Sequence, residues 1–104
     1  MNKPGKEELN ELVARAITGD KTAFSEVVRR MMNPVVALTY RMTRERESAV
    51  DLAQDSFVAA WQKLKTYRGE SKFESWLFAI AANKTLNFIK TRVSICLFNS
   101  RDVL

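Results

Sequence analysis

The sequence contains no histidine and a single cysteine, Cys96. Histidine is the commonest general base and the commonest metal ligand, so its absence removes the usual routes to acid–base catalysis and to metal binding. One cysteine cannot form an internal disulfide or a cysteine-rich zinc site. There is also no Gly-rich phosphate loop, and paired carboxylates occur only on faces predicted to be solvated. We therefore expect no enzymatic activity, no metal and no cofactor.

Glycine and proline are also scarce, with three Gly and two Pro in 104 residues. Few helix-breaking residues and no sustained alternation of apolar and polar positions favour an all-α chain. The hydrophobic content of 46% is sufficient for the modest core of one domain. No apolar run resembles a signal peptide or approaches the roughly 18 residues of a membrane helix, so we expect a cytoplasmic protein.

The apolar periodicity predicts a compact bundle of four or five helices. Residues 6–18 place apolar side chains on one face, and Gly19 follows as a stop. Asp20 is the predicted N-cap of the next helix. Pro34 should end or kink that helix because proline lacks a backbone N–H, and a further helix is then expected over residues 34–42.

Capping-box spacings predict where the last two helices begin. Ser48 with Asp51 would open one helix, which carries an apolar stripe on one side. Ser71 with Glu74 would open the other, which is expected to run from about residue 72 to residue 92.

The residues after Arg92 differ in character from the rest of the chain. The segment VSICLFNSRDVL (93–104) is short, apolar and without a helical period. We therefore expect residues 1–92 to form the helical domain and residues 93–104 to form an atypical tail.

Positive charge is concentrated in the second part of the sequence. The net charge is +5, and the isoelectric point is about 9.7. Residues 1–62 carry nine Lys/Arg and nine Asp/Glu, whereas the residues from 63 onward carry eight Lys/Arg and three Asp/Glu. The whole excess therefore lies after residue 62, which is compatible with a polyanionic partner such as nucleic acid.

One face of the last predicted helix changes from aromatic through amide to cationic. Spacings of three and four residues place five side chains on it: Trp76, Ile80, Asn83, Asn87 and Lys90. Asparagine can form paired hydrogen bonds with a base edge, and lysine can hold a phosphate. The alternative is a solvated helix face with the tryptophan half in the core, and the sequence leaves both interpretations open.

The loop before that helix contains an aromatic side chain flanked by cations. Tyr67 could stack on an unpaired base while Arg68 and Lys72 contact phosphates. The alternative is a tyrosine that covers a helix end. Gly69 is expected to supply a positive φ angle, which is a structural role.

The preceding helix carries Asp51, Gln54 and Asp55 on the side opposite its apolar stripe. Acids near a helix N-terminus interact favourably with the macrodipole, and this alone could account for Asp51. For Gln54 and Asp55, contact with a protein partner is the alternative.

The run SAVDLAQDSFVAAWQKLKTYRGESKFESWLFAIAANKTLNFIKTR resembles region 2 of bacterial RNA polymerase sigma factors of the sigma-70 family, most closely the extracytoplasmic-function (ECF) group. The earlier FSEVVRRMMNPVVALTYRMT is similar to the first conserved block of that group. The resemblance covers about residues 9–92. It rests on DLAQDSF, the YRG loop and F-x-x-W-L-x-x-I-A-x-N in that order.

The resemblance implies a role for each of these motifs. The DLAQD helix would dock on the clamp helices of the polymerase β′ subunit through Asp51, Gln54 and Asp55. The following loop and helix would melt the promoter −10 element and capture a base flipped from the non-template strand. The positions that match this pocket are Tyr67, Trp76, Ile80 and Asn83, with Lys63 at its edge. The residues expected to hold the strand backbone are Lys72, Lys84, Lys90 and Arg92.

Two features depart from the family pattern. ECF factors carry a second helical domain, region 4, which reads the −35 element, and the residues after Arg92 do not encode one. The apolar tail also replaces the expected basic linker. The chain is therefore expected to bind polymerase but to initiate poorly alone, or to be a fragment of a longer protein. The family also implies an anti-sigma factor as a further partner.

Two other classes of function stay open. A truncated sigma-like interaction module would titrate polymerase or an anti-sigma factor through Gln54 and Asp55, without productive DNA binding. A small duplex-DNA repressor would need a recognition helix after a short turn, and the long helix after the YRG loop is less typical of that class. An enzyme ranks below all of these.

Overall fold

The computed structural model describes residues 6–103, which form four α-helices and one short 3-10 helix. The α-helices are α1 (Lys6–Ile17), α2 (Lys21–Thr43), α3 (Arg46–Lys63) and α4 (Phe73–Val103), and η1 (Leu64–Thr66) follows α3 directly. The described residues contain no β-strand. The predicted all-α bundle is confirmed.

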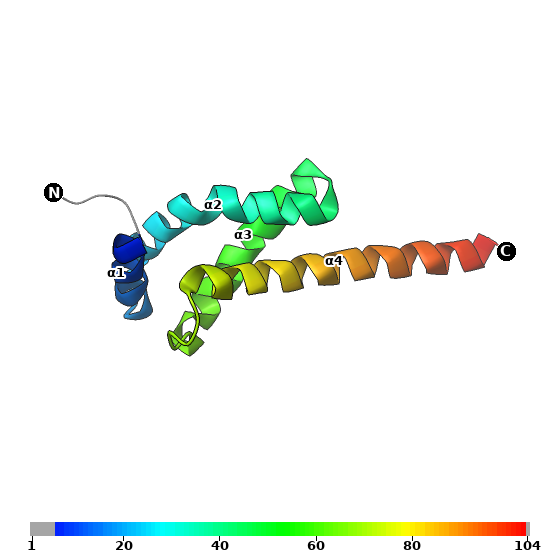
Figure 1. Ribbon diagram of the computed structural model, residues 1–104. Helices are drawn as coiled ribbons and strands as arrows, with labels where there is room; N and C mark the ends of the chain where they lie inside the picture. Colours follow the sequence, from blue (N-terminus) through cyan, green and yellow to red (C-terminus); the bar gives the residue numbers. More distant parts are fainter. Residues whose placement is uncertain (1–5, 104) are drawn as a thin grey trace.

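The helices are arranged so that α4 extends beyond the rest of the molecule (Figure 1). α3 returns diagonally from the end of α2 to the loop that precedes α4, and α1 lies against the start of α2. The molecule measures 65 × 24 × 22 Å because α4 runs out past the bundle towards the C-terminus.

The core lies where all four helices meet. On α4, the side chains of Phe73, Leu77, Ala81 and Thr85 recur every four residues and are at most 1% exposed. This spacing is the signature of one helix face buried against neighbouring helices. The complete buried cluster consists of Leu9, Val13, Ala16, Ala23, Phe24, Val27, Met31, Val35, Ala53, Phe57, Ala60, Leu64, Phe73, Leu77 and Ala81.

The buried hydroxyl groups are all hydrogen-bonded to backbone carbonyls. Thr39 Oγ1 donates to the carbonyl of Ala49 at 2.8 Å and so connects α2 with α3. Ser56 and Thr85 each donate to the carbonyl four residues earlier in their own helix. Because an unpaired buried hydroxyl would be costly, these bonds let the core contain polar side chains.

The junction between α1 and α2 is formed as predicted. Gly19 has a φ of +105°, a conformation that glycine adopts without steric cost. The Asp20 carboxylate accepts the Ala23 N–H at 3.1 Å and is the N-cap of α2. That hydrogen bond, together with the nearby Arg15 guanidinium, lowers the pKa of Asp20.

The expectation that a helix ends at Pro34 is wrong, because α2 continues through this residue to Thr43, whereas the alternative of a kink stays a prediction. Proline removes one backbone hydrogen bond, but Pro34 lies on the exposed side of the helix. Met31, Val35 and Thr39 are buried at a constant spacing of four on the other side. Burial of that continuous face outweighs the lost bond, so residues 34–42 are not a separate helix.

The predicted start of α3 at Ser48 is also wrong. α3 begins at Arg46, and its N-cap residue is Glu45, whose backbone carbonyl accepts the Ala49 N–H. Arg44, with a φ of 59°, ends α2 immediately before it, so the connection leaves no residues for a later start. Ser48 lies inside the helix, and its hydroxyl donates to the Glu45 carboxylate at 2.8 Å.

The last helix is longer than the sequence suggested, because α4 continues to Val103 instead of ending near Arg92. No Gly or Pro occurs between Phe73 and Val103 to stop it. Residues 90–95 are all exposed, so this part of α4 lies outside the bundle. The absence of an apolar period after residue 92 therefore marks the end of packing, not the end of the helix. The division of the chain at residue 92 stays a prediction.

Two leucines of α4 provide a test of this packing. Leu77 is 0% exposed and Leu86 is 45% exposed. We expect Leu77→Ala to lower the free energy of unfolding by about 2–5 kcal/mol, because it leaves a cavity in the core. Leu86→Ala should lower it by less than about 0.5 kcal/mol. Denaturant unfolding followed by circular dichroism measures both, and equal losses would contradict the assigned orientation of α4.

Candidate nucleic-acid interface

The loop between η1 and α4 is built around a cluster of three aromatic rings. The Tyr67 ring lies 5.6 Å from Phe73 in an edge-to-face arrangement and 5.3 Å from Trp76 in a tilted one. Phe73 is 1% exposed, whereas Tyr67 and Trp76 are half-buried. The two outer rings therefore rest on a buried one, which fixes their positions at the surface.

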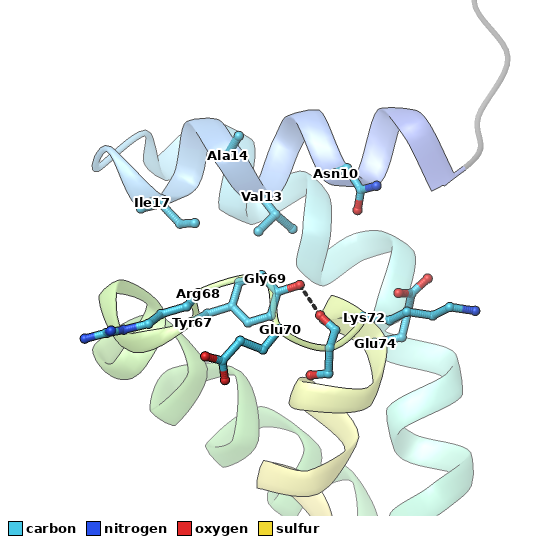
Figure 2. Close-up of a pocket in the computed structure, with 11 residues that line it drawn as sticks. Asn10, Val13, Ala14, Ile17, Tyr67, Arg68, Gly69, Glu70, Lys72 and Glu74 are labelled. Carbon is cyan, nitrogen blue, oxygen red and sulfur yellow. Dashed lines mark hydrogen bonds between the residues drawn. The ribbon is translucent and has the colours of Figure 1, made fainter.

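A hydrogen bond within the loop also holds Tyr67 in place. Its hydroxyl donates to the backbone carbonyl of Ser71 at 2.6 Å (Figure 2). Gly69, between these residues, has the predicted positive φ, at +79°. The expected N-cap role of Ser71 is wrong, because α4 begins at Phe73 and the Lys72 carbonyl accepts its first helical N–H, from Trp76.

Two hollows flank this loop. The larger, about 690 Å³, lies between the loop and α1, and Asn10, Val13 and Ile17 form its α1 side (Figure 2). The smaller, about 370 Å³, has Tyr67 and Trp76 in its wall. The other residues that line the smaller hollow are Thr66, Arg68, Glu70 and Ser71.

The smaller hollow combines groups suited to an unpaired base. Trp76 and Tyr67 offer aromatic surface for stacking. Glu70 brings a carboxylate, which can accept a hydrogen bond from a base amino group. Thr66 brings a hydroxyl that donates to the Lys63 carbonyl at 2.6 Å, so its oxygen can act as a further acceptor. Glu70 and Thr66 were not among the predicted site residues, because neither belongs to a periodic face and only the loop conformation brings them beside Trp76.

The cations of the loop diverge. Arg68 and Lys72 are exposed, and Figure 2 shows their side chains extending towards opposite ends of the loop. Lys63, at the end of α3, is exposed as well. The loop can therefore present positive charge on either side of a bound strand, which is how phosphate contacts fix the register of a nucleic acid.

The predicted face of α4 divides into a packed part and an exposed part. Trp76 and Ile80 are half-buried and pack against the core cluster. Asn83, Asn87 and Lys90 are exposed. Of the four expected pocket positions, Tyr67 and Trp76 line the smaller hollow, whereas Ile80 and Asn83 do not, and the pocket role of all four stays a prediction. The amides lie further along the helix.

Lys84 and Arg92 lie elsewhere, beside α3. Both line a hollow of about 460 Å³ that also contains Leu52 and Asp55 of α3. Arg92 forms an ion pair with Glu45 at 2.7 Å, and its guanidinium lies 5.2 Å from the centre of the Phe88 ring. The hydrogen bond from Arg92, with a second from Ser48, lowers the pKa of Glu45.

The three candidate polymerase contacts of α3 share one solvent-facing strip. Asp51, Gln54 and Asp55 are all exposed. Val58, one turn further on, is 57% exposed, which is unusual for an aliphatic side chain between buried residues of the same helix. The strip therefore combines acidic, amide and apolar groups that are exposed within residues 6–103.

The chain matches the family model for sigma-70 region 2 over residues 27–94. The chain belongs to this family. It is 40% identical over 78 residues to the ECF RNA polymerase sigma-E factor of Haemophilus influenzae, covering 75% of this chain and 41% of that protein. It is 34% identical over 87 residues to the RNA polymerase sigma-H factor of Pseudomonas aeruginosa, covering 84% of this chain and 45% of that protein.

These similarities place the sigma region 2 chain in the ECF group. It spans less than half the length of the curated relatives it matches. A solved NMR structure of an engineered region 2 of sigmaE in complex with GTAAAA has the same fold, with a TM-score of 0.77 and 28% identity. That similarity covers 88% of this chain and 94% of the other.

Two further observations describe the chemistry available to the sigma chain. Within residues 6–103, no helix combines the length and hydropathy that a membrane span requires. Over the same residues, no three His, Cys, Asp or Glu side chains are grouped closely enough to hold a metal ion.

The hydrogen bond from Tyr67 gives a testable contribution to loop stability. Tyr67→Phe keeps the aromatic cluster but removes the bond to Ser71, so we expect a loss of about 0.5–1.5 kcal/mol in the free energy of unfolding. Tyr40→Phe is the matched control, because Tyr40 is 44% exposed and its hydroxyl has no hydrogen bond among the described residues. Denaturant titration measures both, and an unchanged Tyr67→Phe would show that water replaces this bond.

Proposed function

We propose that this chain docks on core RNA polymerase and captures a base flipped from the non-template strand of a promoter −10 element. The observation that carries the proposal is the hollow beside Trp76, where aromatic rings, a carboxylate and a hydroxyl meet under a cationic loop. The fold match to a region 2 in complex with GTAAAA supports a single-stranded ligand for it.

Base capture follows from the chemistry of that hollow. Extruding a base from a duplex costs a few kcal/mol. Stacking on an aromatic side chain returns about 1–3 kcal/mol per base, and hydrogen bonds to the base edge add to this. Tyr67 and Trp76 provide the stacking surface, and Glu70 and Thr66 provide edge contacts. Phe73 already holds both rings in position, so binding of a base costs little side-chain entropy.

The rest of the strand would follow the exposed side of α4. Asn83 can contact a base edge and Lys90 can contact a phosphate. Asn87 is exposed at the boundary of this side, because it also lines the hollow beside α3, and it can contact a base edge from there. Arg68, Lys72 and Lys63 would contact phosphates near the captured base. These contacts recognise DNA but break no bond, so the chain supplies promoter recognition in the cytoplasm while the polymerase performs the synthesis.

Docking on the polymerase would use the exposed strip of α3. Asp51 and Asp55 offer charge, Gln54 offers hydrogen bonds, and Val58 offers apolar surface to a β′ clamp helix. An anti-sigma factor that covered the same strip would compete with the polymerase.

Substitution of the lysine and of the asparagine on α4 should change oligonucleotide binding in different ways. Lys90→Ala should weaken binding to single-stranded GTAAAA and to other oligonucleotides alike. It should also reduce the slope of log affinity against log salt by about 0.7, the value for one phosphate contact. Asn83→Ala should mainly reduce discrimination between GTAAAA and singly substituted versions. Fluorescence anisotropy over a salt series measures both effects, and binding untouched by either change would rule out this side of α4.

Charge reversal on α3 tests the docking surface. Asp55→Lys should abolish association with purified core RNA polymerase while leaving the helical circular dichroism spectrum unchanged, because Asp55 is exposed. Glu11→Lys is the control, since Glu11 is also exposed but lies on α1. Association is measured by co-purification and by titration of labelled chain. Equal retention of Asp55→Lys and Glu11→Lys would remove α3 as the docking helix.

A further inference from the structure

A groove between α3 and α4 brings together charged residues that the sequence assigned to different partners. Lys84 and Arg92 were expected to hold DNA, and Asp55 was expected to contact polymerase, yet all three line the same hollow of about 460 Å³. The apolar residues of this groove are Leu52, Phe88 and Ile95. The groove therefore has apolar side chains in its lining, together with the cations Lys84 and Arg92 and the Asp55 carboxylate.

Helical geometry separates Arg92 from the proposed DNA side of α4. Arg92 follows Asn83 by nine positions, which is about two and a half turns, so the two residues lie on opposite sides of the helix. Lys90, about two turns after Asn83, stays on the asparagine side and is exposed. Lys84 is half-buried and turned towards α3, since it lines the groove with Leu52 and Asp55.

Contacts with its neighbours fix the direction of Arg92. Its guanidinium is bound to the Glu45 carboxylate at 2.7 Å, at the start of α3, and lies 5.2 Å from the Phe88 ring centre. Glu45 is in turn bound by the Ser48 hydroxyl at 2.8 Å. These contacts direct the cation towards α3, away from a strand that follows Asn83 and Lys90.

We propose that Lys84 and Arg92 belong to the polymerase-docking surface and do not contact the DNA backbone. This inference rests on the proposed docking function and extends it from the exposed strip of α3 into the groove. Asp55 joins the two, because it belongs to the exposed strip and also lines the groove. One bound helix could therefore cover both surfaces without a gap.

The chemistry of the groove defines the occupant as an amphipathic polymerase helix. Its aliphatic side chains would enter between Leu52, Phe88 and Ile95, its acidic groups would face Lys84 and Arg92, and a basic group would face Asp55. A phosphate backbone suits this groove poorly, since it would meet apolar side chains and the Asp55 carboxylate. Pairing with the α4 of a second copy is also disfavoured, because the sequence from residue 75 to residue 101 contains no acid to balance its cations.

The test compares two affinities for each single variant of the full chain. Lys84→Gln and Arg92→Gln are titrated against purified core RNA polymerase and, separately, against single-stranded GTAAAA over a salt series. Lys90→Gln is the positive control for the salt slope. Lys21→Gln is the charge-matched control for polymerase binding, because Lys21 is exposed at the start of α2, away from the groove. Thermal unfolding confirms that each variant is folded.

We expect Lys84→Gln and Arg92→Gln each to weaken polymerase binding roughly five-fold, which is equivalent to the loss of one ion pair of about 1 kcal/mol. Their DNA salt slopes should equal that of the unmodified chain, whereas Lys90→Gln should lose about 0.7. A reduced slope in either variant, or unchanged polymerase affinity in both, overturns the inference. The Asp55→Lys variant separates this inference from the proposed docking function. If only the groove assignment is wrong, Asp55→Lys still abolishes polymerase binding.

Discussion

The burial of one side of the first half of α4 is the interaction on which the rest of the molecule depends. Phe73, Leu77, Ala81 and Thr85 enter the core at a constant spacing of four, and this fixes the rotation of the helix about its axis. Once that rotation is set, Asn83 and Lys90 must face solvent, and Lys84 and Arg92 must face α3. The aromatic cluster depends on the same contact, because Phe73 is both a core residue and the support for Tyr67 and Trp76.

The remaining elements hold α4 and its loop in position. α1 closes the far side of the loop, and Arg30 of α2 ties α1 to α2 through an ion pair at 3.1 Å with Glu8, while a second pair at 3.1 Å joins it to Glu26 within α2. The carboxylate hydrogen bonds raise the pKa of Arg30, which keeps its charge at any physiological pH. These ion pairs are half-buried at the surface, where such pairs contribute modestly to stability, so their role is orientation more than energy. Most of the stabilisation comes from the apolar contacts beneath them.

Much of the fold could be predicted from the sequence because its signals are local. The apolar periodicity predicted an all-α bundle, and Asp20 and Gly19 predicted the first junction correctly. The errors arose where tertiary packing outweighed a local preference. Burial of Met31 and Val35 carries α2 through Pro34, and a two-residue connection moves the start of α3 ahead of Ser48. The site was less predictable, since periodicity groups the residues of one helix but does not bring Glu70 beside Trp76 or Lys84 beside Asp55.

The length of α4 has a consequence for how the two proposed partners influence each other. One uninterrupted helix carries Asn83 and Lys90 on the proposed strand side and Arg92 on the opposite, groove side, while Asn87 also lines the groove. A partner that favours one orientation of this helix changes the free energy with which the other partner binds. Such coupling is reciprocal: if bound polymerase strengthens the binding of promoter DNA by some factor, promoter DNA strengthens the binding of polymerase by the same factor. Dissociation of either partner would then lower the affinity of the chain for the other, so release of the chain from promoter DNA would favour its release from polymerase.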